Sequence, residues 1–261
     1  MNTFVLFKNA RVHYNVYGQG DVVVLLHGFL ENSTMWHDFI PKWSKNNRIV
    51  TIDLLGHGQS ECINHVHSME LMAEAVNKVL SHLKIQKVTF IGHSMGGYVA
   101  LAYAKLFSSK ISGLCLMNST YKADDKELKL LRARANELVK SNFKNIVQLS
   151  FTNLFAPQSR IKYKEALNSA LSEALKTSVN GYIAAQEGMR IRLDSKNVFK
   201  QLKCKKLIII GKKDAVINGH VLIKEANELQ TEIVELPGGH MSHIENKESF
   251  SYNIMHFIEN L

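Results

Sequence analysis

Six short apolar runs, each followed by turn-forming residues, constrain the fold of this chain more than any other feature. Each run is four or five residues long, and most lack the alternation with polar residues that marks a strand exposed on one face. Such runs are typical of parallel strands that helices cover on both faces. The runs are Val22–Leu26, Ile49–Ile52, Val88–Ile91, Leu114–Met117, Leu207–Ile210 and Ile233–Leu236.

Segments with helical periodicity separate these runs. Between residues 69 and 83, for example, apolar residues recur every three or four positions, as they do on the buried face of a helix. This alternation of strand and helix predicts right-handed crossovers and a mostly parallel, doubly wound sheet of the α/β class, with functional groups at the carboxyl ends of the strands. Ahead of it, Phe4–Tyr17 alternates around Lys8 and Asn9, which predicts an antiparallel hairpin on the sheet edge.

The alternation stops after Met117, which ends the sixth strand if the hairpin supplies the first two. From about Tyr121 to Val198 the sequence shows only amphipathic helical patterns, which predict an all-helical insertion. Pro157 divides this insertion, because a proline in the interior of a helix breaks it. We therefore expect a core domain built from residues 1–120 and 199–261, and a helical insertion at 121–198.

One candidate nucleophile stands at the end of a strand. The segment Gly92-His93-Ser94-Met95-Gly96 follows the run that ends at Ile91 and precedes a helical segment. A serine on such a strand-to-helix turn needs small neighbours, projects its hydroxyl from the top of the sheet and is followed by an amide that points at a developing oxyanion. An ordinary turn serine would explain the bare pattern, but the strand before it and the helix after it favour a nucleophile.

A serine hydroxyl needs a base, and the base needs an orienting acid. Both residue types occur just past strand ends: Asp214 follows the run ending at Ile210, and His240 follows the run ending at Leu236. The three residues together predict a Ser-His-Asp triad. Asp124 and Asp125 are alternative acids, although they lie further past their strand and would also stabilise the N-terminus of the first helix of the insertion.

These segments resemble the α/β-hydrolase superfamily, in its capped esterase-like branch, over nearly the whole chain. The matching segments are His27-Gly28-Phe29, Asp53-Leu54-Leu55-Gly56-His57-Gly58-Gln59-Ser60, Gly92-His93-Ser94-Met95-Gly96-Gly97, Gly211-Lys212-Lys213-Asp214 and Gly239-His240-Met241.

The resemblance implies that the amides of Phe29 and Met95 form the oxyanion hole, that the insertion at 121–198 is a cap over the pocket, and that no cofactor is needed. Dehalogenases and epoxide hydrolases of this fold use an aspartate nucleophile, and Ser94 argues against both. Thioesterases, lactonases, carbon–carbon bond hydrolases and a few lyases share the serine triad.

Arg190 and Arg192, near the end of the insertion, are candidates for binding a substrate carboxylate. Because Asp194 lies close by, a local ion pair is the alternative interpretation for these arginines. His65 and His67 could suggest a metal pair, but no carboxylate or cysteine accompanies them at a recognisable spacing. We therefore expect a solvated loop there, and no metal site.

Other polar residues near strand ends have structural explanations. Asp53 is expected to accept hydrogen bonds within the turn that runs to Ser60. His27 and His57 belong to structural turns, and His93 should point away from the nucleophile beside it.

The composition is that of an ordinary globular chain, with 46% hydrophobic and 21% charged residues. The net charge of +9 comes from one segment, because residues 121–206 contain 18 Lys/Arg against 8 Asp/Glu and the rest contains 14 against 15. That segment has no aromatic interleaving or recognised binding motif, so we expect no nucleic-acid partner. Its lysines are better explained as solvated helix faces.

The sequence offers no apolar run near the ~20 residues that span a bilayer, and the N-terminal stretch to Tyr17 lacks a signal-peptide core. We therefore expect a cytoplasmic protein without a membrane span. Cys62, Cys115 and Cys204 are odd in number and scattered, so free thiols are expected.

The leading hypothesis is a serine hydrolase that cleaves a small carboxylic ester or thioester through an acyl-enzyme. A ligand sensor that keeps the triad and signals through cap movement is one alternative. A carbon–carbon bond hydrolase or lyase on the same fold is the other.

Overall fold

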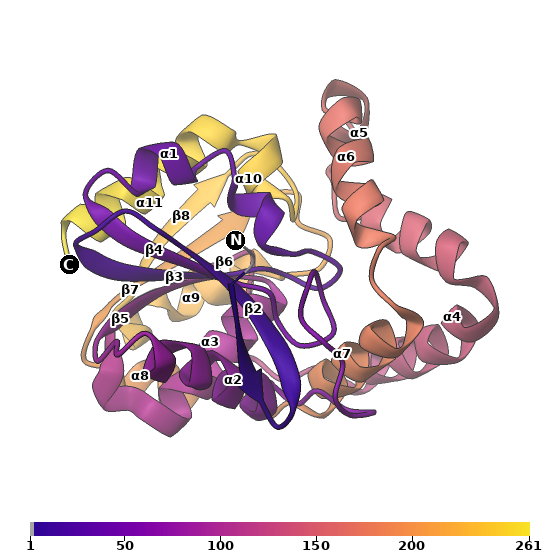
Figure 1. Ribbon diagram of the computed structural model, residues 1–261. Helices are drawn as coiled ribbons and strands as arrows, with labels where there is room; N and C mark the ends of the chain where they lie inside the picture. Colours follow the sequence, from indigo (N-terminus) through magenta and orange to yellow (C-terminus); the bar gives the residue numbers. More distant parts are fainter. Residues whose placement is uncertain (1–2) are drawn as a thin grey trace.

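An eight-stranded sheet lies at the centre of the computed structural model, which describes residues 3–261 (Figure 1). The strands lie in the order β1-β2-β4-β3-β5-β6-β7-β8. β2 pairs antiparallel with β1 and β4, and the other neighbouring strands pair in parallel. The strands are β1 (Thr3–Phe7), β2 (Ala10–Tyr17), β3 (Asp21–Leu26), β4 (Asn47–Ile52), β5 (Val88–His93), β6 (Ile111–Met117), β7 (Lys205–Gly211) and β8 (Glu232–Leu236).

Each of the six apolar runs lies within one of the strands β3 to β8, so the predicted α/β sheet is confirmed. Burial explains why most of these runs hold no polar alternation. The side chains from Val23 to Leu26, for example, are fully buried, because one sheet face packs into one hydrophobic cluster and the other face into a second.

The hairpin at the edge of the sheet is also confirmed. Thr3 to Phe7 pairs antiparallel with Ala10 to Tyr14, and only Lys8 and Asn9 connect the two strands. Both connecting residues have positive φ, 47° and 67°, as a type I′ turn requires.

Helices cover both faces of the sheet, as Figure 1 shows. α2, α3, α8 and α9 contribute to the hydrophobic cluster on one face, and α1 and α11 to the cluster on the other. The helices are α1 (Ile40–Trp43), α2 (Met69–His82), α3 (Met95–Phe107), α4 (Lys126–Thr152), α5 (Ser159–Lys162), α6 (Lys164–Ala174), α7 (Val179–Ile191), α8 (Lys196–Gln201), α9 (Gly219–Leu229), α10 (Ser242–Glu245) and α11 (Lys247–Glu259), with 3-10 turns η1 (Ser33–Trp36) and η2 (Ser108–Lys110).

The chain between β6 and β7 is helical throughout its regular structure, from α4 to α8. α4 to α6 project to one side of the sheet in Figure 1. Pro157 lies between α4 and α5, as expected, whereas the non-helical backbone at Asn142 within α4 was not predicted. The boundary predicted at residue 198 falls inside α8, whose Phe199 is buried in the core cluster.

Within residues 3–261, no helix is both long enough and apolar enough to cross a bilayer. Cys62, Cys115 and Cys204 are free thiols, as expected.

Candidate active site

Ser94 occupies the sharp turn between β5 and α3. Its backbone has φ 47° and ψ −113°, a region that residues other than glycine rarely adopt, and Ser94 precedes the first residue of α3. Hydrogen bonds on both sides hold this strained conformation: the Ser94 amide donates to the Met117 carbonyl at 2.9 Å, and Ser119 Oγ donates to the Ser94 carbonyl at 2.7 Å. The serine predicted to be a nucleophile is therefore fixed on a strand-to-helix elbow.

Glycines around Ser94 let neighbouring backbones approach closely. A Cβ on Gly92 would lie 2.6 Å from backbone atoms of Gly96, which is closer than such atoms pack. A Cβ on Gly96 would overlap the carbonyl of Leu26 at the end of β3, and one on Gly97 would overlap Ser119. The glycines of the motif therefore make the elbow possible and bring it against the loop that follows β3.

His240 and Asp214 come together from two strand ends. Asp214 follows β7, His240 follows β8, and His240 Nδ1 lies 2.8 Å from Asp214 Oδ2. The two side chains are 3% and 0% exposed. This is the geometry of an acid that orients an imidazole, and it leaves Nε2 of His240 outside the contact with Asp214.

The Asp214 carboxylate is built to stay ionised. It accepts hydrogen bonds from Asn118 Nδ2 at 3.0 Å and from the amides of Val216 and Ile217 at 2.8 and 3.0 Å. Burial opposes ionisation, but the attraction to His240 and these hydrogen bonds outweigh it and lower the pKa of Asp214 below its ordinary value. Asn118 was not predicted, although a polar residue directly after the buried strand β6 was a usable signal.

The two amides expected to form the oxyanion hole lie on the loop after β3 and on α3. Met95 is the first residue of α3, so its amide has no acceptor within that helix. Phe29 follows Gly28 in the loop that the elbow touches. The oxyanion role of both amides stays a prediction.

The alternative acids have other functions in the structure. Asp125 caps α4 by accepting a hydrogen bond from the Leu128 amide at 2.8 Å. The Asp124 carboxylate is fully buried between Arg132 and Arg192, each at 2.6 Å.

Arg190 and Arg192, the candidates for a substrate carboxylate, are each paired with a carboxylate of the protein. Arg190 contacts Glu187 at 2.7 Å, and Arg192 contacts Asp124 and stacks over the ring of Tyr98 at 3.9 Å. The structure therefore agrees with local ion pairs, although not with the partner Asp194 suggested by the sequence. A role for both arginines in binding substrate stays a prediction.

The prediction of a solvated loop at residues 65–67 is wrong for His67. That side chain is fully buried, and its Nδ1 lies 3.1 Å from the carbonyl of Leu55. The packing of this loop under helix α7 explains the difference, because the His67 amide donates to the Ala184 carbonyl at 2.9 Å. His65 is exposed, as expected.

The turn after β4 has the structural role expected of it. Asp53 accepts from the Gln59 amide at 2.9 Å, and also contacts the Ser33 amide and His13, which the sequence did not indicate. His27 accepts a hydrogen bond from the Leu54 amide, and His57 donates one to the Leu55 carbonyl.

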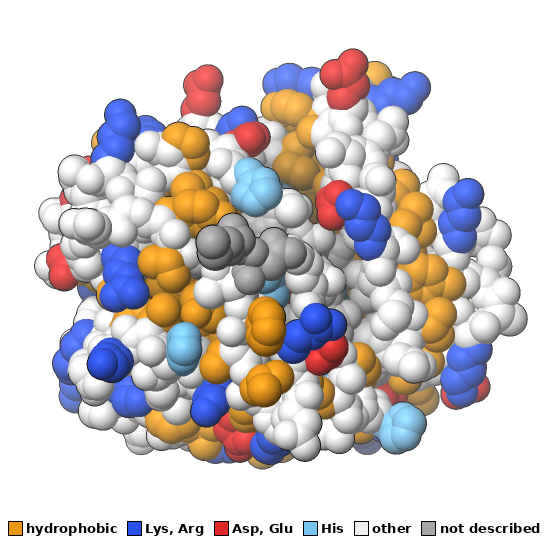
Figure 2. All heavy atoms as spheres, viewed as in Figure 1, with side chains coloured by type: hydrophobic (Ala, Val, Ile, Leu, Met, Phe, Trp, Pro, Cys, Tyr) orange, Lys and Arg blue, Asp and Glu red, His pale blue; other side chains and the backbone are white. Residues whose placement is uncertain are grey.

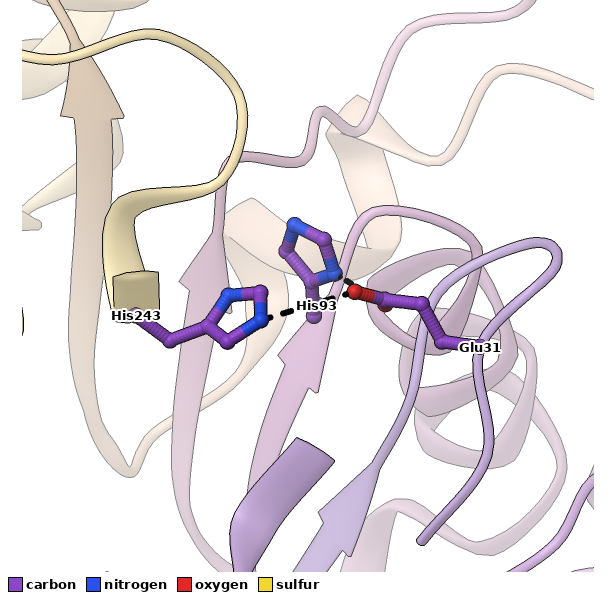
Figure 3. A group of neighbouring side chains, drawn as sticks. All are labelled: Glu31, His93 and His243. Carbon is purple, nitrogen blue, oxygen red and sulfur yellow. Dashed lines mark hydrogen bonds and ion pairs between the residues drawn. The ribbon is translucent and has the colours of Figure 1, made fainter. Parts of the chain in front are cut away.

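One buried group was missed at the sequence level: Glu31, His93 and His243, shown in Figure 3. One ring nitrogen or carboxylate oxygen of each residue could bind a metal ion, and these atoms lie within 4.8 Å of one another. However, Glu31 Oε2 and His93 Nδ1 are 2.5 Å apart, whereas two ligands of a tetrahedral zinc ion with bonds of about 2.1 Å lie roughly 3.4 Å apart. This spacing fits a shared proton better than a shared metal.

A cavity of about 1020 Å³ opens beside this group. It is lined by Glu31 and His243, by residues of α6 such as Ala170 and Glu173, and by the end of α4 at Phe151. Ser94, Asp214 and His240 do not line it, so it does not define the space around the candidate nucleophile.

Basic side chains do not form one patch on the face seen in Figure 2, where blue Lys and Arg groups lie singly among polar and hydrophobic ones. Many basic residues of the insertion are also paired, including Lys140 with Glu137 and Lys176 with Glu173. These pairs agree with the interpretation of the insertion's lysines as solvated helix faces.

Comparisons with known proteins agree with this architecture. A thermophilic esterase from Thermogutta terrifontis, solved with malate bound, has a TM-score of 0.92 and 28% identity over 99% of this chain and 97% of that chain. The enol-lactonase from Burkholderia xenovorans LB400 has a TM-score of 0.90 at 21% identity, over 98% of this chain and 100% of that one.

Curated relatives add sequence evidence. 3-Oxoadipate enol-lactonase 2 of Acinetobacter baylyi is 23% identical over 95% of this chain and 92% of its own length. An uncharacterized protein of Mycobacterium tuberculosis is 35% identical, but the match covers 41% of this chain and only 31% of that protein. The sequence model described as alpha/beta hydrolase fold matches residues 21–247. Since this match spans most of the chain, the protein belongs to the alpha/beta hydrolase fold family.

Proposed function

We propose that this protein is a serine hydrolase that cleaves a small carboxylic ester or thioester through an acyl-enzyme. The observation that carries the proposal is the 2.8 Å contact between His240 and Asp214 at the same sheet edge as the strained elbow of Ser94. Nucleophilic acyl transfer requires a buried acid, an imidazole that the acid orients and a serine held on a strand-to-helix turn.

In the first half of the reaction, Ser94 Oγ attacks the acyl carbon while His240 Nε2 accepts the hydroxyl proton. Asp214 holds the imidazole by its other nitrogen and stabilises the imidazolium that forms. The amides of Phe29 and Met95 donate to the oxyanion of the tetrahedral intermediate. His240 then returns the proton to the departing alcohol or thiol, and the acyl group stays on Ser94.

In the second half, water replaces the leaving group. His240 accepts a proton from water as the resulting hydroxide attacks the acyl-enzyme. His240 then returns that proton to Ser94 Oγ while the second tetrahedral intermediate collapses, which releases the carboxylic acid and restores the Ser94 hydroxyl. The helices α4 to α7 form the cap that closes over the acyl chain.

A lactone is the second substrate class that a specific observation favours. Full-length similarity to enol-lactonases supports it, and a lactone is an internal ester that the same steps would open. Comparing activated esters of increasing acyl length with a thioester and a lactone, by kcat/KM, would rank these classes.

Covalent labelling tests the proposal directly. An organophosphonate should label the protein only at Ser94, because only a base-activated hydroxyl reacts at neutral pH. Ser94→Ala should abolish both labelling and ester turnover. Ser108→Ala, at the exposed opposite end of α3, is the matched control and should keep both. Labelling that persists in Ser94→Ala would contradict the proposed nucleophile, and labelling without turnover of any substrate in the panel would favour a ligand sensor.

A further inference from the structure

A chain of buried hydrogen bonds connects the three loops of the proposed site, and the residues of the triad do not take part in it with their side chains. The Gly28 amide, next to Phe29, donates to Glu31 Oε2 at 2.7 Å. His93 Nδ1 lies 2.5 Å from the same oxygen, and His93 Nε2 lies 3.0 Å from the backbone carbonyl of His240. Figure 3 shows Glu31 reaching His93 from the loop after β3.

The partners of His93 determine how many protons the pair holds. A backbone carbonyl can only accept, so Nε2 of His93 must carry a hydrogen. Glu31 Oε2 already accepts from the Gly28 amide, and its short contact with Nδ1 requires one more proton between the two atoms. The pair therefore binds one proton beyond a neutral imidazole and a carboxylate, and its net charge is zero.

Burial makes the pairing of the two charges necessary. The side chains of His93 and Glu31 are 1% and 5% exposed, so an unpaired charge on either residue would be costly. The same carboxylate in the paired state provides a fixed acceptor for the loop that carries Phe29, and the imidazolium provides a fixed donor for the loop that carries His240.

We propose that Glu31 and His93 are positioning residues, an imidazolium–carboxylate pair that fixes the backbone of His240 relative to the loop of Phe29. The proposal rests on the function proposed above, because it assigns to the pair the alignment of the base with the oxyanion amides. His93 is next to Ser94 in sequence, so the pair ties the elbow, the base loop and the oxyanion loop to one buried centre.

The charged and titratable groups around the pair agree with this protonation state. Burial disfavours the charged form of His93, but the Glu31 carboxylate, the carbonyl of His240 and the more distant Asp214 outweigh it and raise the pKa of His93. Burial also opposes the charge of Glu31, yet His93, with His243 and His27 nearby, lowers the pKa of Glu31 to about 2.

His243 is the remaining ring against the pair. Its Nε2 lies 3.7 Å from Glu31 Oε1, and burial lowers the pKa of His243 to about 3, so it is a neutral neighbour. Its ring packs 5.3 Å from the ring of His93, and the His240 ring packs at 5.1 Å.

Two substitutions and a matched control test the positioning role. Glu31→Gln keeps the shape of the side chain but removes its charge, and His93→Gln removes the imidazolium. Both should lower kcat and the rate of phosphonylation of Ser94 by about 10²-fold, as a misplacement of about 1 Å does, with a smaller change in KM. The control is His13→Gln, which removes the imidazole of another buried histidine–carboxylate pair. His13 lies on strand β2, and its Nδ1 is 2.9 Å from Asp53 Oδ2. Its thermal stability should fall while its kcat falls far less.

The protonation state is measured independently of activity. Histidine-labelled protein should show two ring N–H signals for His93 in ¹⁵N NMR between pH 6 and 8, assigned by their loss in His93→Gln, and Glu31→Gln should remove one of them. A single ring N–H in the wild type would overturn the proposal, as would loss of the Nδ1 signal on adding zinc ion, which would assign a metal site instead.

Kinetics supply the remaining decisive outcome. If folded Glu31→Gln and His93→Gln retain wild-type phosphonylation rates, or lose activity only as much as His13→Gln does, the pair has a structural role alone and the proposal fails. If wild-type Ser94 is not labelled at all, the proposed serine hydrolase fails, and the NMR result still decides the state of the pair.

Discussion

Asp214 and Asp124 both follow the end of a buried strand, yet their surroundings suit them to different tasks. Asp124 lies between two arginines, Arg132 and Arg192, which hold α4 against the end of α7. Asp214 instead accepts from neutral donors and from His240. A carboxylate paired with two guanidiniums has little capacity left to orient an imidazole, so the geometry favours Asp214 as the acid.

Replacing the acid tests this assignment. Asp214→Asn should lower kcat by about 10³- to 10⁴-fold with the fold intact, because an amide no longer selects the tautomer of His240 that leaves Nε2 free to accept. Asp125→Asn is the matched control, since Asp125 is exposed and an asparagine can also cap α4. Steady-state kinetics and thermal melts of both variants give the comparison. Equal small losses of kcat would remove Asp214 from the triad.

The placement of the proposed triad residues could be predicted because a strand end fixes where a residue lies. Ser94, Asp214 and His240 each follow a parallel strand, and parallel strands end at one edge of the sheet. The pair of Glu31 and His93 could not be predicted in the same way. These residues are 62 positions apart, and their contact depends on side-chain orientation rather than on a strand end.

At the scale of elements, α7 contacts the core through glycines. A Cβ on Gly181 would overlap the carbonyl of Gly56, and a Cβ on Gly188 would overlap the carbonyl of His67. Between them, the His67 amide donates to the carbonyl of Ala184. The backbone of α7 therefore lies directly on the loops after β4, and small residues are the reason that it can.

This contact predicts an unusual sign for a glycine-to-alanine change. In an unobstructed helix, alanine stabilises by up to about 1 kcal/mol relative to glycine. In Gly188→Ala the added methyl would overlap a backbone carbonyl that cannot rotate away, and overpacking costs about 1 to 3 kcal/mol. We expect a net loss in the free energy of unfolding, measured by urea denaturation.

Asn180→Ala, on an exposed position of α7, is the control and should leave the free energy of unfolding unchanged or slightly raised. A stabilised Gly188→Ala would mean that α7 does not approach the loop of His67 this closely.

Helix periodicity predicted the insertion but not its internal geometry. Apolar spacing and Pro157 indicated helices and one break, and both are present. The non-helical backbone at Asn142 left no mark of that kind, because the helix propensity of asparagine is close to that of many residues that helices contain. Likewise the glycines of α7 lowered its helix propensity without revealing which loop they contact.

At the scale of the whole molecule, the chain buries several histidines without charge. Burial lowers the pKa of His57 to about 3, and burial likewise lowers the pKa of His243 to about 3, from an ordinary value of 6.5. Both side chains are at most 5% exposed, so the folded protein resists protonating them. The pKa of His93 is instead raised, and the Glu31 carboxylate beside it is the reason.

These shifts predict that acid destabilises the fold well before its carboxylates are protonated. Between pH 6.5 and about 3 the unfolded chain protonates His57 and His243 while the folded chain does not, so stability falls as pH falls, by up to about 1.4 kcal/mol per pH unit for each histidine. The lowered pKa of Glu31 adds a loss in the same direction below about pH 4.5. The raised pKa of His93 acts oppositely, because its contribution to stability is complete below pH 6.5 and is lost as pH rises through its folded value.

Urea denaturation at pH 7, 6 and 5 measures the slope of stability against pH. His243→Gln should reduce that slope by about one proton, whereas Asn180→Ala, which removes no titratable group from an exposed position, should keep it. An unchanged slope in His243→Gln would show that the His243 ring is already protonated in the folded protein. Glu31 would then have a second cationic neighbour instead of a neutral one.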